Sequence, residues 1–197
     1  MRISKKLILA SRSPRRQILL RQIGLEFEVR ESGIIEEFDS RKSLEENVKI
    51  LSERKARAVA RPDDNAIIIG ADTIVALGSE ILGKPKDERE ASHMLATLSS
   101  RTHEVCTGFS LLDLPSSMTT SSFEVTKVTF RTLSADEIRE YVKNGSPMDK
   151  AGGYGIQDDY GAVFVEKVEG CFYNVVGFPL AKFYVTMQEF VKKLNQI

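Results

Sequence analysis

Apolar and polar positions along the chain predict strands and helices in alternation. Residues 66–70 are apolar without interruption, which is typical of a strand buried on both faces. Leu25, Phe27 and Val29 alternate with charged residues and predict a half-buried strand. Further strands are predicted over residues 7–10, 74–77, 81–82, 105–112, 123–130 and 162–165.

Capping residues mark where the helices begin. Ser13 can cap a helix, and Pro14 fits the first helical position, where its missing N–H costs nothing. We therefore predict a helix over residues 14–23 that ends at Gly24. Residues 43–46 form a capping box that opens a second helix. Further helices are predicted to begin near Asp87, Ser134 and Pro179.

The order of these elements predicts the fold class. Strands interleaved with helices indicate an α/β fold with a mixed sheet. At 197 residues the chain can bury a substantial core, and we expect residues 1–197 to form a single domain. Residues 113–122 are rich in Ser and Thr and contain Pro115, so we expect a surface loop there.

Composition narrows the classes of partner. Hydrophobic residues make up 42% of the chain and charged residues 28%, as in an ordinary globular protein. The 28 basic and 28 acidic residues cancel, which argues against a protein that binds nucleic-acid polymers non-specifically. A small anionic ligand held by a local cluster of cations is compatible with this balance.

Cysteine usage and the N-terminal segment favour a cytoplasmic protein. Cys106 and Cys171 have no short spacing, so they indicate neither a disulfide framework nor a zinc site. The apolar run over residues 7–10 is too short for a signal peptide or a membrane span. We expect no membrane partner.

Three arginines crowd the start of the first predicted helix. Arg12, Arg15 and Arg16 lie where the helix dipole is positive, and each cation placed there costs about 0.3–1 kcal/mol. A strand-to-helix turn with free N–H groups, hydroxyls and guanidinium groups is suited to binding phosphate. The alternative is a solvated helix end whose arginines point into water.

Asp72 and Lys55 are the next candidates. Asp72 follows three isoleucines at the predicted end of a buried strand, where α/β proteins place ligand sites. It could act as a general base or bind a metal, or it could simply bond to N–H groups of a turn. Lys55 occupies one step of an apolar helical stripe, so it either snorkels from the core edge or faces a polar cleft.

Two loops carry further polar groups. Lys84 lies in a Gly-Lys-Pro turn, where proline stiffens the chain around the ammonium group, although any surface turn can carry a lysine. Residues 149–157 place Asp149, Lys150 and Gln157 around three glycines, whose backbone N–H groups can wrap a ligand. The Gln157 amide can both donate to and accept from the edge of a nucleobase.

Several familiar site motifs are absent from the sequence. It contains no Walker-type phosphate loop and no G-x-S-x-G nucleophile motif. The dinucleotide fingerprint fails because Asp158 stands where its third glycine belongs. His93 and His103 do not have the spacing of metal ligands. Carboxylate, lysine and arginine side chains remain, and they suit metal-assisted phosphate chemistry.

Five short segments are distinctive when they are taken together. They are Ser-Arg-Ser-Pro-Arg-Arg at 11–16, Gly-Ala-Asp-Thr at 70–73, Leu-Gly-Lys-Pro at 82–85, Met-Asp-Lys-Ala-Gly-Gly-Tyr-Gly-Ile-Gln at 148–157 and Asn-Val-Val-Gly-Phe-Pro-Leu at 174–180. In this order they resemble the Maf family of house-cleaning nucleoside triphosphate pyrophosphatases. The resemblance implies a mixed, twisted sheet flanked by helices, with two lobes around a central cleft (Maf/ITPase-like).

The resemblance also implies a reaction and its catalytic residues. Water attacks the α-phosphate of a nucleoside triphosphate and releases pyrophosphate, with the help of a divalent cation such as Mg²⁺, Mn²⁺ or Co²⁺. By this likeness Asp72 is the general base, and Lys55 and Lys84 neutralise the triphosphate. Glu37 helps to hold the metal or water, so Glu37 and Asp72 are the expected metal ligands.

Substrate binding is assigned in the same way. Ser11, Arg15 and Arg16 match the phosphate-cradling loop of the family. The run Asp-Lys-Ala-Gly at 149–152 with Gln157, together with Thr73 and Arg15, resembles the branch that hydrolyses dTTP, UTP and modified pyrimidine nucleotides. The alternatives are a pyrophosphatase of 7-methylguanosine triphosphate and a non-catalytic, nucleotide-binding regulator of cell division. Family likeness implies a homodimer.

The chain departs from the family pattern at two places. Ser146 stands where the family often has glutamate, which removes a carboxylate from that position. Residues 158–160 add bulk and charge where a glycine commonly follows Gln157. We expect this second departure to affect the shape of the base pocket.

Overall fold

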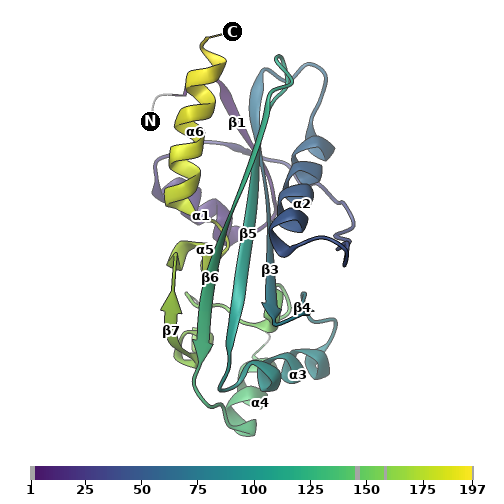
Figure 1. Cartoon of the computed structure of the whole chain (residues 1–197), viewed down its shortest axis with the longest axis vertical. Helices are drawn as coiled ribbons and strands as arrows, with labels where there is room; N and C mark the ends of the chain where they lie inside the picture. The colour runs from purple at the N-terminus through teal and green to yellow at the C-terminus, as the bar shows by residue number, and fades with distance from the viewer. Residues whose placement is uncertain (1–2, 145–146, 158, 197) are drawn as a thin grey trace. The chain divides into compact units, whose positions relative to one another are not determined.

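The computed structural model describes residues 3–144, 147–157 and 160–196, together with the backbone of Asp159 (Figure 1). Ser146 and Asp158, which depart from the family pattern, lie outside the described residues. The strands are β1 Lys6–Ala10, β2 Glu28–Val29, β3 Ala66–Leu77, β4 Glu80–Leu82, β5 Thr102–Asp113, β6 Thr119–Phe130 and β7 Val165–Glu169. The helices are α1 Pro14–Gln22, α2 Leu44–Val59, α3 Glu88–Leu98, α4 Ala135–Lys143, α5 Phe172–Val176 and α6 Leu180–Leu194, with 3₁₀ turns η1 Ala151–Gly153 and η2 Asp159–Phe164.

The predicted α/β fold with a mixed sheet is confirmed. Seven strands form one sheet in the order β2-β1-β3-β5-β6-β7, and β4 pairs with β3. Pairing is parallel between β1 and both β2 and β3, and antiparallel between β3 and β4 and between β6 and β7. Among the described residues, no helix is both long enough and apolar enough to span a membrane.

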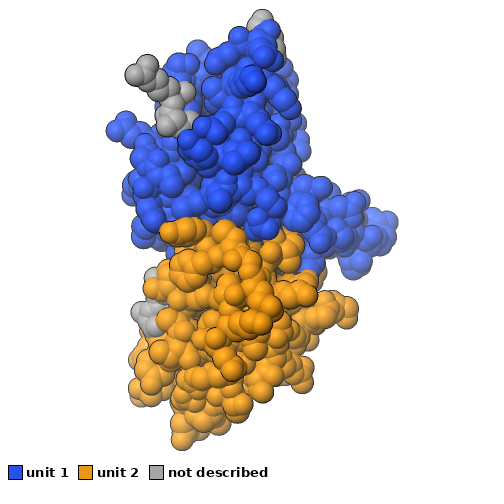
Figure 2. Space-filling view, turned by 60° about the vertical axis from the view of Figure 1, so that its left-hand side comes forward, with its two compact units in different colours: residues 1–72, 107–124, 177–197 blue, residues 73–106, 125–176 orange. Residues whose placement is uncertain are grey.

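The chain divides into two compact units (Figure 2). The first unit comprises residues 1–72, 107–124 and 177–197, and the second comprises residues 73–106 and 125–176. Strands β3, β5 and β6 contribute residues to both units. A single domain over residues 1–197 stays a prediction.

In the first unit, α2 packs closely against the sheet. Gly70 on β3 permits this approach, since a Cβ atom there would lie 1.9 Å from the carbonyl oxygen of Ser52. Gly108 on β5 permits the same close approach, since a Cβ atom there would lie 2.5 Å from the carbonyl carbon of Val48. The apolar cluster beneath α2 contains Ile8, Ala10, Ala56, Val59, Ala66, Ile68 and Leu112.

The second unit has its own aromatic core. Phe130 lies at its centre, with ring centroids 4.7 Å from Tyr154 and 6.0 Å from Phe164. Tyr141 of α4 packs against Phe164 at 5.0 Å. Helix α3 adds a further apolar face made by Ala91, Met94, Leu95 and Leu98. This core supports the loops that carry the remaining candidate residues.

Several predicted boundaries were wrong. Residues 66–77 form one strand, so Asp72 lies within β3 and not at a strand end. Strand β6 begins at Thr119, which shortens the expected loop over residues 113–122. The strand predicted over 162–165 begins only at Val165, because the preceding residues form a 3₁₀ turn. Pairing across the sheet, which local sequence does not encode, extends these strands.

Candidate active site

The arginine-rich turn after β1 is built as the sequence predicts. Ser13 caps α1 by accepting from the backbone N–H of Arg16, and Pro14 is the first helical residue. The Ser11 hydroxyl is buried and accepts from the backbone N–H of Ser13 at 3.2 Å. The first turn of α1, which is described in full, contains no acidic residue, so Arg15 and Arg16 lie at the positive end of the helix dipole.

Arg16 does not point into water. Its Nη1 atom donates to the Ala71 carbonyl at 2.9 Å and to the Ser11 hydroxyl at 3.2 Å, while Nε donates to the Gly177 carbonyl at 3.0 Å. These contacts lie within the first unit and bring the guanidinium group beside the residue that precedes Asp72. The alternative of a solvated helix end is therefore wrong for Arg16. Arg15 is half-buried.

Asp72 and Lys55 form a buried ion pair. Lys55 Nζ lies 2.5 Å from Asp72 Oδ1, and the two residues expose 6% and 3% of their surface. The pair exists because α2 packs closely on β3 at Gly70, so that the helical turn carrying Lys55 faces the strand. The inward position of Lys55 thus places its ammonium group in a buried ion pair.

The environment of Asp72 opposes its charge. Burial raises the pKa of this carboxyl above its ordinary value, whereas the Lys55 ammonium and the Arg16 guanidinium act to lower it, and Glu36 adds to the rise. Burial likewise lowers the pKa of Arg16, against the opposing effect of Asp72 and Glu36. Oδ2 of Asp72 is buried and has no hydrogen-bond partner among the described residues. A basic oxygen is therefore available in a cationic, partly desolvated setting.

Glu36 also contacts Lys55, and the sequence did not identify this residue. Its Oε1 atom lies 2.6 Å from Lys55 Nζ, and its side chain is 34% exposed. Glu37, which the family resemblance favoured, is exposed beside it. Adjacent glutamates outside regular structure have no periodicity that could tell which one faces the site. The structure thus brings together Ser11, Arg16, Glu36, Lys55 and Asp72 in one unit.

The donor set fits a hard cation that binds together with a substrate. Across residues 3–144, 147–157 and 160–196, no cluster of three or more His, Cys, Asp or Glu side chains could hold a metal. Two carboxylates are nevertheless present, on Asp72 and Glu36, and one oxygen of Asp72 is unpartnered among the described residues. Mg²⁺ is typically bound by one or two carboxylates, with phosphate oxygens and water completing its shell.

The remaining candidates lie in the second unit. Thr73 follows Asp72 in β3 and is half-buried, and Lys84 is exposed in the turn after β4. Residues 149–157, which we call the glycine segment, are tied to that turn because the Gly152 N–H donates to the Gly83 carbonyl at 3.0 Å. Gln157 is half-buried at the end of the glycine segment.

Lys150 is a buried cation within the glycine segment. It exposes 7% of its surface, and its Nζ atom lies 2.8 Å from Asp149 Oδ1. The sequence marked Lys150 only as one of several polar groups in this loop. Its burial could not be foreseen, since neighbouring glycines give no amphipathic pattern.

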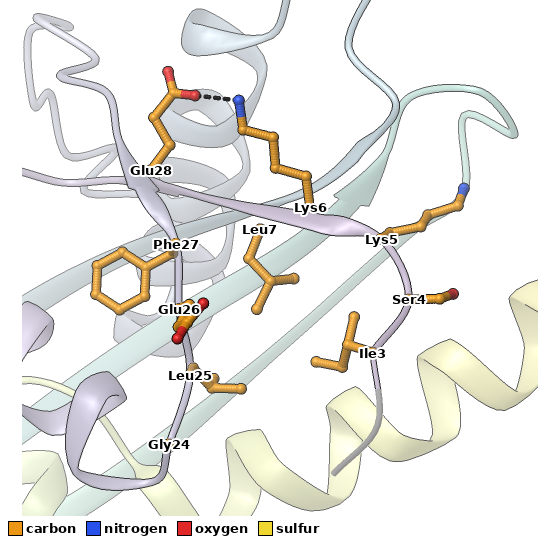
Figure 3. A pocket seen from close by; sticks show the side chains of 10 residues that line it. All are labelled: Ile3, Ser4, Lys5, Lys6, Leu7, Gly24, Leu25, Glu26, Phe27 and Glu28. Atoms are coloured by element: carbon orange, nitrogen blue, oxygen red, sulfur yellow. Dashed lines mark ion pairs between the residues drawn. The ribbon is translucent and has the colours of Figure 1, made fainter.

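A separate pocket lies at the start of β1 (Figure 3). It has a volume of about 690 Å³ and is lined by residues 3–7 and 24–28 of the first unit. An ion pair of 2.5 Å between Lys6 and Glu28 lies at this pocket. None of its lining residues belongs to the candidate set, so we do not assign it to the site.

Comparisons with known proteins show the family to which the chain belongs. The Maf-like protein family matches residues 6–190, which include both groups of candidates. The chain is 46% identical to a dTTP/UTP pyrophosphatase of Desulforamulus reducens, covering 90% of this chain and 93% of the relative. It is 48% identical to a dTTP/UTP pyrophosphatase of Carboxydothermus hydrogenoformans (93% and 98%) and 45% identical to one of Bacillus pumilus (94% and 96%). With a match that runs from β1 to the last turn but one of α6, the chain belongs to the Maf family.

Proposed function

We propose that this protein hydrolyses dTTP, UTP and modified pyrimidine nucleotides to the nucleoside monophosphate and pyrophosphate. The observation that carries the proposal is the buried Asp72 carboxylate, held by Lys55 beside Arg16 in a chain that belongs to the Maf family. Relatives named dTTP/UTP pyrophosphatase, 45–48% identical over most of the chain, support the substrate class. We further propose that the enzyme works as a cytoplasmic homodimer.

The chemical step assigns a separate task to each oxygen of Asp72. Oδ1 is held by Lys55, and the unpartnered Oδ2 takes a proton from the attacking water. The water oxygen bonds to the α-phosphorus as the bond from that phosphorus to the bridging oxygen breaks. Pyrophosphate leaves with the electrons of the broken bond. Lys55 and Arg16 stabilise the negative charge on the phosphates from fixed positions.

A divalent cation fits the same group of residues. Asp72 and one member of the acidic pair Glu36–Glu37 would hold it, and we assign Glu36 because it contacts Lys55. When bound, the cation would polarise the phosphate and offset its charge. Ser11 and Arg16 would keep the triphosphate oriented, because Arg16 is fixed by three hydrogen bonds to oxygen atoms.

The nucleobase end of the substrate is assigned to the second unit. We propose two lobes around a central cleft, with Lys84 on the triphosphate and Thr73 and Gln157 selecting the base together with Arg15. This arrangement is the one that the match to the Maf family favours. An amide such as Gln157 can pair with both a carbonyl and an N–H of uracil or thymine.

The proposal is tested by pyrophosphate release from a panel of triphosphates with Mg²⁺, Mn²⁺ or Co²⁺. We expect kcat/KM to be highest for UTP and dTTP. A preference for 7-methylguanosine triphosphate would instead assign the protein to the other branch of the family. Nucleotide binding without pyrophosphate release, with each cation, would support a non-catalytic regulator.

A further inference from the structure

His103 and Tyr154 form a buried polar pair to which the proposed mechanism assigns no role. His103 Nε2 lies 2.7 Å from the Tyr154 hydroxyl, within hydrogen-bond distance. His103 belongs to β5 and Tyr154 to the glycine segment, and they expose 1% and 5% of their surface. Both rings pack edge-on against Phe130, with centroid distances of 5.0 Å and 4.7 Å.

Packing alone does not explain a histidine at this place. Its Nδ1 atom is buried and has no hydrogen-bond partner among the described residues. Burial also lowers the pKa of His103 from 6.5 to about 4, so the ring is neutral near pH 7. A polar group left unsatisfied in a core costs free energy that an apolar ring of similar size would avoid. The hydrogen bond to Tyr154 is what the imidazole adds.

The hydrogen bond between His103 and Tyr154 acts on a segment that is rich in glycine. Gly152 and Gly153 have φ angles of 71° and 73°, which few other residues adopt, and Gly155 follows directly after Tyr154. The Gly152 N–H is bound to the Gly83 carbonyl, next to Lys84. A Cβ atom on Gly152 would lie 3.0 Å from Val75, so the backbone also rests against β3.

We propose that His103 is a positioning residue for nucleobase selection, acting through its hydrogen bond to Tyr154. The bond fixes the glycine segment on β5, three residues before Gln157. Together with the contact between Gly152 and Gly83, it holds the chain on both sides of Gly153. The inference rests on the proposed function, because it assumes that Gln157 contacts the base.

Two variants remove the hydrogen bond, and the first of them keeps the aromatic ring. Tyr154→Phe deletes only the hydroxyl, and His103→Leu deletes both nitrogens. Because Gln157 would lose its fixed position, we expect the ratio of kcat/KM for UTP to that for CTP to fall about tenfold in each variant. The fall should appear mainly as a higher KM for UTP. The value of kcat should change little, because Asp72 and Lys55, which are proposed to act in the chemical step, belong to the other unit.

Three controls separate positioning from core stability. His103→Gln keeps a side-chain donor and acceptor and should restore part of the selectivity. Val128→Ala truncates an apolar residue of the same core and should lower the thermal midpoint without changing the ratio. The double variant His103→Leu/Tyr154→Phe should lose no more selectivity than either single variant, because both remove the same bond.

Binding of α,β-methylene analogues of UTP and CTP, which are not cleaved between those phosphates, separates this inference from the proposed function. If the wild-type protein releases no pyrophosphate but binds the UTP analogue selectively, and Tyr154→Phe loses that selectivity, the enzyme assignment fails and the positioning role stands. Wild-type selectivity in both Tyr154→Phe and His103→Leu would overturn the positioning role and leave the enzyme assignment intact. Equal binding of both analogues by the wild type would also overturn it.

Discussion

The ammonium group of Lys55 lies 2.5 Å from Oδ1 of Asp72, in a place almost closed to water. A buried ion pair contributes little to stability when both partners are costly to desolvate. Here it has a geometric consequence instead, because one carboxylate oxygen is occupied and the other is left available. The pair therefore defines the atom at which a general base would act.

Replacing Asp72 by asparagine keeps the shape of the side chain and removes the base. We expect Asp72→Asn to lower kcat by about 10²- to 10⁴-fold, the range for loss of general base catalysis. Binding of UTP should change by less than about tenfold, that is ~1.4 kcal/mol, because the phosphate-binding groups remain. Pyrophosphate release and calorimetric titration measure the two effects. The matched control is Asp136→Asn, in an exposed ion pair of α4, and full activity in Asp72→Asn would remove Asp72 from the mechanism.

The two adjacent glutamates provide an internal comparison. Both residues are exposed, but Glu36 contacts Lys55 at 2.6 Å and acts on the pKa of Asp72. We expect Glu36→Gln to lower kcat by at least about tenfold, since a charge-assisted contact next to the base is lost. Glu37→Gln should remain within about twofold of the wild type, because Glu36 and not Glu37 is the member of the pair that acts on Asp72. The opposite order of effects, measured at saturating Mg²⁺, would return the metal-binding role to Glu37.

Gly70 controls the distance between α2 and β3, and hence the Lys55–Asp72 pair. In Gly70→Ala the new Cβ would lie 1.9 Å from the Ser52 carbonyl oxygen and 2.9 Å from the Ala56 nitrogen, on both sides of Lys55. We expect a loss of about 1–3 kcal/mol or more in the free energy of unfolding, and a parallel loss of activity. Gly83→Ala, with no heavy atom within 4 Å of the new Cβ, is the steric control for urea denaturation. Equal stability of the two variants would contradict the close packing.

Local signals in the sequence predicted the starts of the helices well. Ser13 and Ser43 cap α1 and α2 as expected, because a cap is a contact between residues three positions apart. The interior of β3 was not predictable in this way. An aspartate in a strand is unfavourable on local grounds, and Asp72 is accommodated by Lys55, which lies 17 residues earlier in the chain.

In the candidate site, too, local sequence predicted the position of a residue but not its distant partners. Arg16 was identified from its position at a helix start, but its partners Ala71 and Gly177 are 55 and 161 residues away. Such contacts follow from the topology of the sheet and not from any local pattern. The pairing of His103 with Tyr154 across 51 residues was missed for the same reason.

Stability should depend on pH through His103. Burial lowers the pKa of His103 from 6.5 to about 4 in the folded protein, so the unfolded chain binds a proton more readily between these values. The contribution of His103 to the free energy of unfolding is therefore greatest above pH 6.5, where the ring is neutral in both states. It is lost as the pH falls toward 4. The full difference corresponds to about 3 kcal/mol.

Urea denaturation at pH 7 and pH 4.5 measures this contribution. The free energy of unfolding of the wild type should be lower at pH 4.5 than at pH 7. In His103→Gln we expect this difference to be much smaller. The chain has two histidines, and the exposed His93 provides the control, because His93→Gln should retain the wild-type decrease. The same pH dependence in both variants would exclude His103 as its source.

Removal of divalent cations should stop turnover without unfolding the protein. Asp72 and Glu36 supply two carboxylates, and Mg²⁺ bound by one or two carboxylates takes its remaining ligands from phosphate oxygens and water. EDTA should therefore abolish pyrophosphate release and leave the thermal midpoint of the nucleotide-free protein unchanged. Mg²⁺ added together with a non-cleavable UTP analogue should raise the midpoint more than either alone, since a ligand of the native state stabilises it by mass action. A fall in the midpoint with EDTA alone would instead reveal a metal that the folded protein holds without substrate, and Asp72 and Glu36 could not then be its only ligands.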